Sequence, residues 1–262
     1  MKNIKKFTKI RFLDNCLLIN NEILVFSDFH IGYEEYLFGK LIPIRVQLEE
    51  ILKKLNAIFS LLEKENIKIK EIIILGDLKH EFGEISDSEW RETLQLLDYL
   101  LEKTNKIILI RGNHDNILGP IAKKREVELK DYYEVGEMCF MHGDNMFKEC
   151  EDSKILILGH LHPSIAFYDN YKKEKFKCFL RGKWKIAGRN KSRNYLKVII
   201  IPSFIPLVFG YDLHDINEER KDFFIINNKD LEKFEVIIYN DKEDKEYNFG
   251  RLKTLIKKTN SF

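Results

Sequence analysis

Five short segments of this 262-residue chain place metal-binding side chains directly after an apolar, strand-like run. They are Asp28-Phe29-His30, Gly76-Asp77-Leu78-Lys79-His80, Gly112-Asn113-His114-Asp115, Met141-His142-Gly143-Asp144 and Gly159-His160-Leu161-His162. Strand ends on one edge of an α/β sheet converge, so we expect these side chains to meet in one site. In an extended chain, residues i and i+2 face the same side, so the Asp28/His30 and His160/His162 pairs should each point into one cavity. The glycines before Asp77, Asn113 and His160 should permit the sharp turns that this requires.

The distribution of histidine also indicates a metal site. The chain has seven histidines, and all but His214 lie in these segments. A single histidine is more often a core or surface residue, but this concentration beside Asp and Asn favours ligation. Imidazole and carboxylate ligands without thiolate suit manganese, iron or zinc rather than calcium or a structural zinc site.

The composition is that of a globular protein with a substantial core, because 44% of the residues are hydrophobic and 12% are aromatic. The net charge of only +2 argues neither for nor against nucleic-acid binding, so any such binding would have to depend on a local basic patch. The apolar runs are too short to span a membrane.

The chain has four cysteines and no CxxC motif; the cysteines are Cys16, Cys139, Cys150 and Cys178. Together with the absence of a signal peptide, this predicts reduced thiols and a cytoplasmic protein.

The first half of the chain alternates predicted strands and helices. Residues 16–19 and 22–27 should form a hairpin around Asn20-Asn21. Apolar residues at helical spacing predict helices over 43–65, starting near Pro43, and over 88–103, capped by Ser88. Buried strands are expected at 71–75 and 106–110.

Beyond residue 125 the pattern is mostly of strands. They are expected at about 131–135, 138–141, 154–158, 164–168, 176–179, 195–201, 222–226 and 235–239, with a helical turn near 145–151. No linker divides the chain, so we expect one domain over residues 1–262, with an exposed basic loop at about 181–194. The predicted fold class is α/β, with two mixed sheets packed face to face and flanked by helices.

The ordered motifs DxH, GDxxH, GNHD, HG and GHxH resemble the calcineurin-like metallophosphoesterase superfamily over roughly residues 22–165. The resemblance implies two metals bridged by Asp77. One metal would take Asp28, His30 and His162, and the other Asn113, His142 and His160. A water held between them would become the attacking hydroxide. By the same resemblance His114 would protonate the leaving oxygen, with Asp115 holding it near the site.

His80 narrows the resemblance, because GDxxH is similar to the SbcD-type nuclease branch, where this histidine is thought to help position the phosphate. It can also simply hold Asp77 or His114. Three later segments resemble archaeal SbcD-related and DNA-ligase-associated phosphoesterases; they are Lys177-Cys178-Phe179, residues 201–209 and Phe249-Gly250-Arg251-Leu252. About 100 residues follow His162, largely core-like strands, which makes a large DNA-grasping cap doubtful.

A run of cations without an acid follows residue 180, and it can contact nucleic-acid phosphates, with Trp184 stacking on a base; the cations are Arg181, Lys183, Lys185, Arg189, Lys191 and Arg193. A solvated loop is the simpler interpretation. Lys79 can likewise meet a substrate phosphate.

Three functions remain open. The leading hypothesis is a manganese-dependent phosphodiesterase (with iron or zinc as alternatives) acting on nucleic acid or nucleotide diesters. A phosphomonoesterase is the second, and a non-catalytic scaffold on the same fold is the third. The apolar helices are compatible with a homodimer.

Overall fold

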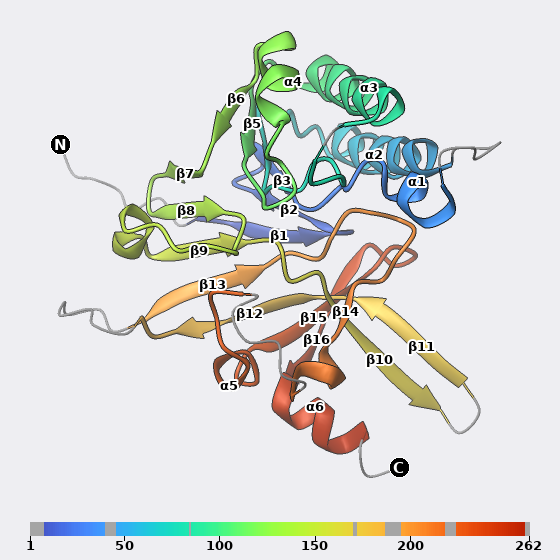
Figure 1. Ribbon diagram of the computed structural model, residues 1–262. Helices are drawn as coiled ribbons and strands as arrows, with labels where there is room; N and C mark the ends of the chain where they lie inside the picture. The colour runs from blue at the N-terminus through green and yellow to red at the C-terminus, as the bar shows by residue number, and fades with distance from the viewer. Residues whose placement is uncertain are drawn as a thin grey trace, which may run out of the picture.

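Two β-sheets packed face to face form the centre of the protein, and helices lie on their outer faces (Figure 1). The computed structural model describes residues 8–39, 46–83, 85–169, 172–186, 195–217 and 224–259. The expected α/β fold of two mixed sheets with flanking helices is confirmed.

The first sheet combines an antiparallel amino-terminal part with parallel strands. Its strands, in spatial order, are β1 (Ile10–Leu13), β2 (Cys16–Ile19), β3 (Ile23–Phe26), β4 (Glu71–Ile74), β5 (Ile107–Ile110) and β6 (Glu128–Lys130). The expected hairpin joins β2 to β3, and Asn20 and Asn21 both adopt positive φ, which asparagine tolerates well. From β3 to β6 the strands are parallel.

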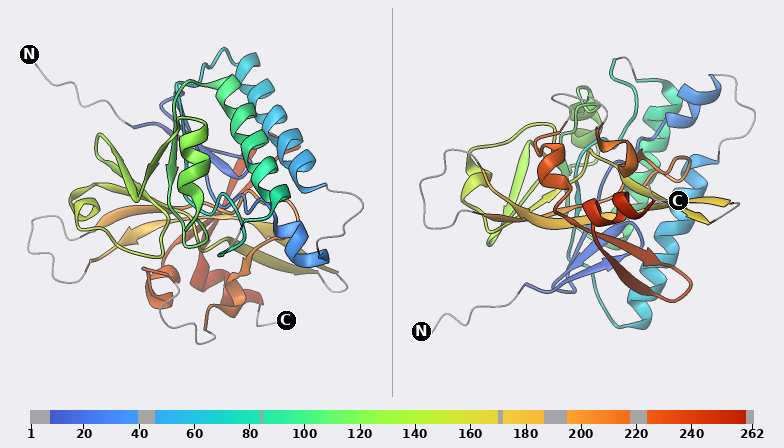
Figure 2. Two further views of the ribbon diagram at one scale, coloured as in Figure 1. Left: turned by 45° about the horizontal axis from the view of Figure 1, so that its top comes forward. Right: turned by 90° about the horizontal axis from the view of Figure 1, so that it is seen from below.

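Four helices accompany the first sheet: α1 (Tyr33–Phe38), α2 (Gln47–Lys64), α3 (Asp87–Lys103) and α4 (Leu118–Lys124). Figure 2 shows α2 and α3 side by side. The start expected at Pro43 lies outside the described residues, which resume at 46. The cap expected at Ser88 is wrong. Ser86 is the cap, because its Oγ accepts from the Glu89 backbone N–H at 3.1 Å, whereas Ser88 Oγ bonds the Glu35 carboxylate.

The second sheet runs in the order β16-β15-β12-β13-β9-β8-β7. Its strands are β7 (Tyr132–Val135), β8 (Met138–Met141), β9 (Ile155–Leu158), β12 (Phe179–Trp184), β13 (Leu196–Ile200), β15 (Glu235–Asn240) and β16 (Lys245–Arg251). Its outer face is covered by short helical segments, namely η1 (Glu149–Asp152), η2 (Leu213–Asn217), α5 (Asn228–Leu231) and α6 (Leu252–Thr259).

A small third sheet, which the sequence did not indicate, contains β10 (Pro163–Asp169), β11 (Lys172–Lys177) and β14 (Tyr211–Asp212). The single strand expected at 176–179 is wrong, because the chain passes from one sheet to another at Cys178. Residues 224–226 form no strand. The loop expected from Arg181 is partly strand, because β12 continues to Trp184 in register with β13, and residues 187–194 lie outside the described part.

A shared hydrophobic core fills the space between the two sheets, with Val25 and Ile73 from one and Phe140 and Ile199 from the other. The single domain over residues 1–262 stays a prediction. None of the helices in the described part of the chain has the length and apolar character needed to cross a bilayer.

The cysteines depart from the expectation of four reduced thiols. Cys139 in β8 and Cys150 in η1 form a disulfide, with their Cα atoms 5.4 Å apart, while Cys16 and Cys178 are free and buried. The pairing was invisible in the sequence because it depends on η1 folding back against β8.

The direction of the strands positions the site. β3, β4 and β5 are parallel and end at one edge of the first sheet, and β8, β9 and β13 do the same in the second. A hydrogen bond of 3.1 Å from the His160 backbone N–H to Asp28 Oδ2 joins the two edges. The motif residues of both sheets therefore meet.

The segment after β13 holds the backbone of the Asp28-Phe29-His30 motif in place. Phe204 and Ile205 donate their backbone N–H groups to the carbonyls of Ser27 and Asp28, at 2.8 and 3.2 Å. This buried segment is held by Lys177, whose Nζ donates to Ser203 O at 2.8 Å, to Ser203 Oγ at 3.1 Å and to Ile205 O. Burial lowers the pKa of Lys177 to about 7.

We predict that Lys177→Met lowers the free energy of unfolding by about 1–3 kcal/mol, because buried carbonyls lose their donor. Urea denaturation would measure the loss. Lys173→Met, on the same strand but exposed, is the matched control. Equal stability of the two variants would show that Lys177 does not hold the segment.

Candidate metal centre

All seven side chains expected to bind metal lie together where the two sets of strand ends meet. Asp28, His30 and Asp77 come from the first sheet and are buried. His142 and His160, which follow β8 and β9, are also buried. Asn113 and His162 are partly exposed at the rim.

The first group of ligand atoms surrounds the space between Asp28 and Asp77. His162 Nε2 lies 3.1 Å from Asp28 Oδ1 and 3.3 Å from His30 Nε2. His30 Nε2 lies 3.6 Å from Asp77 Oδ2. Ligand atoms of these four residues are all within 4.8 Å of one another.

The second group lies on the other side of Asp77. His142 Nε2 is 3.4 Å from Asp77 Oδ2, 2.9 Å from His160 Nδ1 and 3.0 Å from Asn113 Oδ1. Asp77 Oδ2 thus faces both groups, while its Oδ1 accepts the His114 backbone N–H at 3.0 Å. This bond fixes Asp77 Oδ1, and it thereby holds Oδ2 between the two groups.

The backbone is left-handed rather than extended at five of the seven candidate ligands. Positive φ occurs at Asp28 (55°), His30 (45°), Asp77 (49°), His160 (64°) and His162 (48°). The i and i+2 pairs do share a cavity, but the extended geometry expected for them is wrong. Non-glycine residues in this region cost conformational energy and cluster at functional sites.

Two of the glycines serve close packing rather than turning. A Cβ at Gly112 would lie 2.2 Å from Asp77 Oδ1, and one at Gly159 would lie 1.9 Å from Ser27 Oγ. Neither has positive φ. Any larger residue there would displace the Asp77 carboxylate or the serine that donates to Asp28.

The electrostatics favour charged carboxylates. Burial alone would raise the pKa of Asp28, but His162 and His142 outweigh it and the pKa falls to about 2. The pKa of Asp77 is lowered for the same reason, chiefly by His142. Burial opposes protonation of His142, yet Asp77 and Asp28 raise its pKa to about 10.

The donor set fits divalent cations. Imidazole nitrogens face each other and the carboxylates across distances near 3 Å, and the buried Asp28 Oδ1 lies 3.1 Å from His162 Nε2. Such converging lone pairs repel unless a proton or cation lies among them. Histidine, carboxylate and amide oxygen without thiolate are ligands that manganese, iron and zinc accept.

His114 and His80 lie beside this cluster. His114 Nδ1 donates to the carbonyl of His80, and its Nε2 lies 3.9 Å from Asp77 Oδ2. The two rings stack with centroids 5.1 Å apart, and His80 Nδ1 is 3.2 Å from His30 Nδ1. Burial and the neighbouring His114 lower the pKa of His80 to about 4, so its ring is neutral at neutral pH.

Asp115 holds the loop rather than the His114 ring. Its buried carboxylate accepts from the Gly112 and Lys79 backbone N–H groups, at 3.0 and 3.5 Å. Burial and the charge of Asp77 raise the pKa of Asp115 to about 6. Lys79 is also buried and donates to the carbonyls of Glu81 and His114, so the expectation that it meets a phosphate is wrong.

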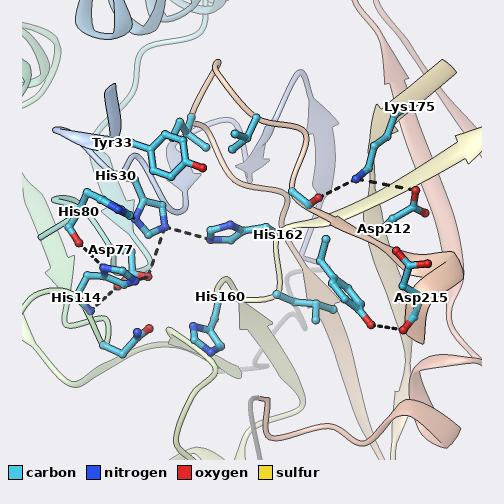
Figure 3. A pocket seen from close by; sticks show the side chains of 16 residues that line it. His30, Tyr33, Asp77, His80, His114, His160, His162, Lys175, Asp212 and Asp215 are labelled. Atoms are coloured by element: carbon cyan, nitrogen blue, oxygen red, sulfur yellow. Dashed lines mark hydrogen bonds and ion pairs between the residues drawn. The ribbon is translucent and has the colours of Figure 1, made fainter. Parts of the chain in front are cut away.

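A cavity of about 540 Å³ opens onto the cluster (Figure 3). Its far wall was not found from the sequence and comes from β11, β14 and η2. There Lys175 Nζ donates to Gly210 O at 2.9 Å and lies 3.9 Å from Asp212 Oδ2. Tyr211 OH donates to Asp215 O at 2.7 Å. No motif marks these residues, because only the third sheet brings them to the site.

The basic stretch lies away from this cavity. Arg181 and Lys183 line a separate depression with Lys197 and Ile155, at the amino ends of β9 and β13, whereas the ligands follow the carboxyl ends. Lys185 lines neither hollow, and Arg189, Lys191 and Arg193 are outside the described residues. Trp184 is only 9% exposed and packs in the core, so the stacking expected of it is wrong.

Comparison with known proteins identifies the family of the chain and solved structures that resemble it. The nuclease MPE of Pseudomonas putida is 18% identical, with a TM-score of 0.56 over 89% of this chain and 93% of that chain. Zinc-bound Vps29 of Entamoeba histolytica is 17% identical, with a TM-score of 0.33 over 86% and 91% of the two chains. No curated protein matches the sequence. A family model described as calcineurin-like phosphoesterase matches residues 22–239, and the chain therefore belongs to the calcineurin-like phosphoesterase family.

Proposed function

We propose that the protein is a dinuclear metal-dependent phosphodiesterase. The observation that carries the proposal is Asp77 Oδ2, which faces two separate groups of ligand atoms at 3.6 and 3.4 Å. Asp28, His30 and His162 complete one group, and Asn113, His142 and His160 the other. Manganese is the first choice, with iron or zinc as alternatives.

Two bound cations would supply an activated water and neutralise the charge on the phosphate oxygens. His114 would donate a proton from Nε2 to the leaving oxygen, since Nδ1 is already held by the His80 carbonyl. His80 supports this arrangement through its backbone and stacked ring, and its neutral side chain can donate a hydrogen bond to the phosphate. Asp115 keeps Gly112 and the following motif in place.

A diester of nucleic acid or nucleotide is the proposed substrate. The GDxxH segment supports this choice, as does the nuclease of Pseudomonas putida that shares the fold. A phosphomonoesterase is the alternative, because the same centre can cleave both ester types. A scaffold is disfavoured because every ligand position and His114 are occupied by side chains able to act.

The deciding experiment compares hydrolysis of bis(nitrophenyl) phosphate and nitrophenyl phosphate by metal-stripped protein reloaded with manganese. We expect cleavage of the diester, loss with a chelator, and recovery on adding metal. Cleavage of the monoester alone would make the protein a phosphatase. Inactivity on both the diester and the monoester, with no metal retained, would favour a non-catalytic scaffold.

Asp77→Asn and His114→Ala should separate metal binding from proton transfer. Asp77→Asn should lose both metal and activity, because the bridge serves both groups. His114→Ala should keep its metal and lose roughly 10²- to 10⁴-fold in rate on an alkyl diester. The loss should be smaller on a nitrophenyl diester, whose leaving group departs without a proton. Elemental analysis beside the rates would test this, and equal metal loss in both variants would refute the division.

We also propose that the depression lined by Arg181, Lys183 and Lys197 binds phosphates of a long nucleic acid. Arg181 is paired with Glu235 at 2.7 Å, whereas Lys183 and Lys197 are uncompensated in the described contacts. The depression has a volume of about 720 Å³ and also contains Lys233 and Arg251.

Lys183→Glu should weaken binding of a long oligonucleotide and reduce the slope of log Kd against log salt by about 0.7–0.9. Lys123→Glu, on the exposed end of α4, is the matched charge control. Binding titrations at several salt concentrations would measure both. An unchanged slope would remove the depression from the nucleic-acid path.

Cytoplasmic location and a homodimer stay predictions. The Cys139–Cys150 disulfide is not what a reducing cytoplasm favours, so the location needs a direct test by fractionation of the source cells.

A further inference from the structure

Exposed aromatic rings at the mouth of the metal centre have no part in the proposed chemistry. Tyr36 is 64% exposed and Phe82 is 55% exposed, and Tyr33 lies between Tyr36 and the cavity. We call Tyr33, Tyr36 and Phe82 the aromatic rim. Large rings gathered in this way at a binding cavity are typical of a surface that a ligand covers.

The rim continues directly from the two histidines beside the ligands. The Phe82 ring lies over His114, with centroids 3.7 Å apart and planes inclined by 33°. Tyr36 and Tyr33 contact the ring of His80 at 4.9 and 4.8 Å. Figure 3 shows Tyr33 beside His30 and His80 at the cavity. The aromatic rim therefore lies directly beside His114, the proposed proton donor.

The rim is fixed by a buried carboxylate. Glu89 of α3 is 1% exposed, and its Oε1 accepts the backbone N–H groups of His80 and Glu81, at 2.7 and 3.0 Å. The His80 N–H is 2.9 Å from Ile31 O, and Ile31 forms a β-bridge with Lys79. The segment carrying Phe82 is therefore anchored to the segment that leads into α1, which bears both tyrosines.

We propose that Phe82 and Tyr36 bind a nucleobase of the substrate, next to the ester bond that is cleaved. This inference rests on the proposed function. His114 would protonate the leaving oxygen, so the leaving nucleoside must lie against His114, and Phe82 covers that ring. A base has flat apolar faces that stack on such rings without regard to sequence. The rim residues carry no charge, which suits a base better than a phosphate.

The test compares a thymidine dinucleotide with analogues in which one or the other nucleoside lacks its base. Wild type, reloaded with manganese, should prefer the complete dinucleotide in kcat/KM. Phe82→Leu keeps apolar bulk but removes the ring, and it should reduce this preference roughly 5- to 100-fold. Phe82→Tyr should restore it. Equal losses on all three substrates would mean that Phe82 only supports His114, and would overturn the inference.

Phe249→Leu is the matched control, because Phe249 is 42% exposed on β16 and lies outside the rim. It should leave the preference as in wild type. A preference of wild type for a phosphotyrosine peptide over the dinucleotide, abolished in Phe82→Leu, would assign the rim to a protein substrate instead.

A second measurement separates this inference from the proposed function. The fluorescence of a 2-aminopurine nucleotide falls when its base stacks, so wild type should quench it more strongly than Phe82→Leu. Quenching by a wild type that cleaves no diester would keep the rim and refute the phosphodiesterase. Diester cleavage with no quenching difference between the two proteins would keep the phosphodiesterase and refute base binding at the rim.

Discussion

The structure depends on the burial of two carboxylates side by side at the meeting point of two sheets. Asp28 and Asp77 lie among imidazole rings with little access to water. Charges removed from water need compensation, and the depressed pKa values show that the carboxyl groups keep their charge. In the absence of metal the proton on His142 supplies part of it. A cation held by this group of side chains would take over that role, because the His142 ring would have to lose its proton to act as a ligand.

The meeting of the candidate ligands in one place was predictable from the sequence, because they follow apolar runs and parallel strands end at the same edge of a sheet. Asp77, His142 and His160 illustrate this most clearly. The local geometry was not predictable in the same way. The sequence predicted that Asp28 and His30 share a cavity, which is correct, but it predicted this from an extended backbone. Both residues are left-handed, and that conformation depends on contacts from the neighbouring strands. One such contact is the 3.2 Å bond from the Asp28 N–H to Gly76 O.

The remaining misses share one cause, which is that they depend on contacts between distant segments. Trp184 lies in a cationic stretch of the sequence yet packs in the core, because it belongs to β12 of the second sheet rather than to a loop. Lys177 appears in the sequence as one lysine among many, and only the fold brings the 203–205 segment to it. The far wall of the cavity, with Lys175 and Asp212, likewise requires the third sheet. Periodicity and motif spacing carry no information on such pairs.

Each of the two groups of candidate ligand atoms combines side chains of both sheets, because His162 joins Asp28 and Asp77 in one group and Asp77 joins His142 and His160 in the other. An ion bound in either group would therefore bind only when the sheets are correctly docked. By mass action, each tenfold excess of metal over its dissociation constant then adds about 1.4 kcal/mol to the free energy of unfolding. The proposed metal centre would thus also hold the two sheets together, and the supply of metal would affect the stability of the protein as well as its activity.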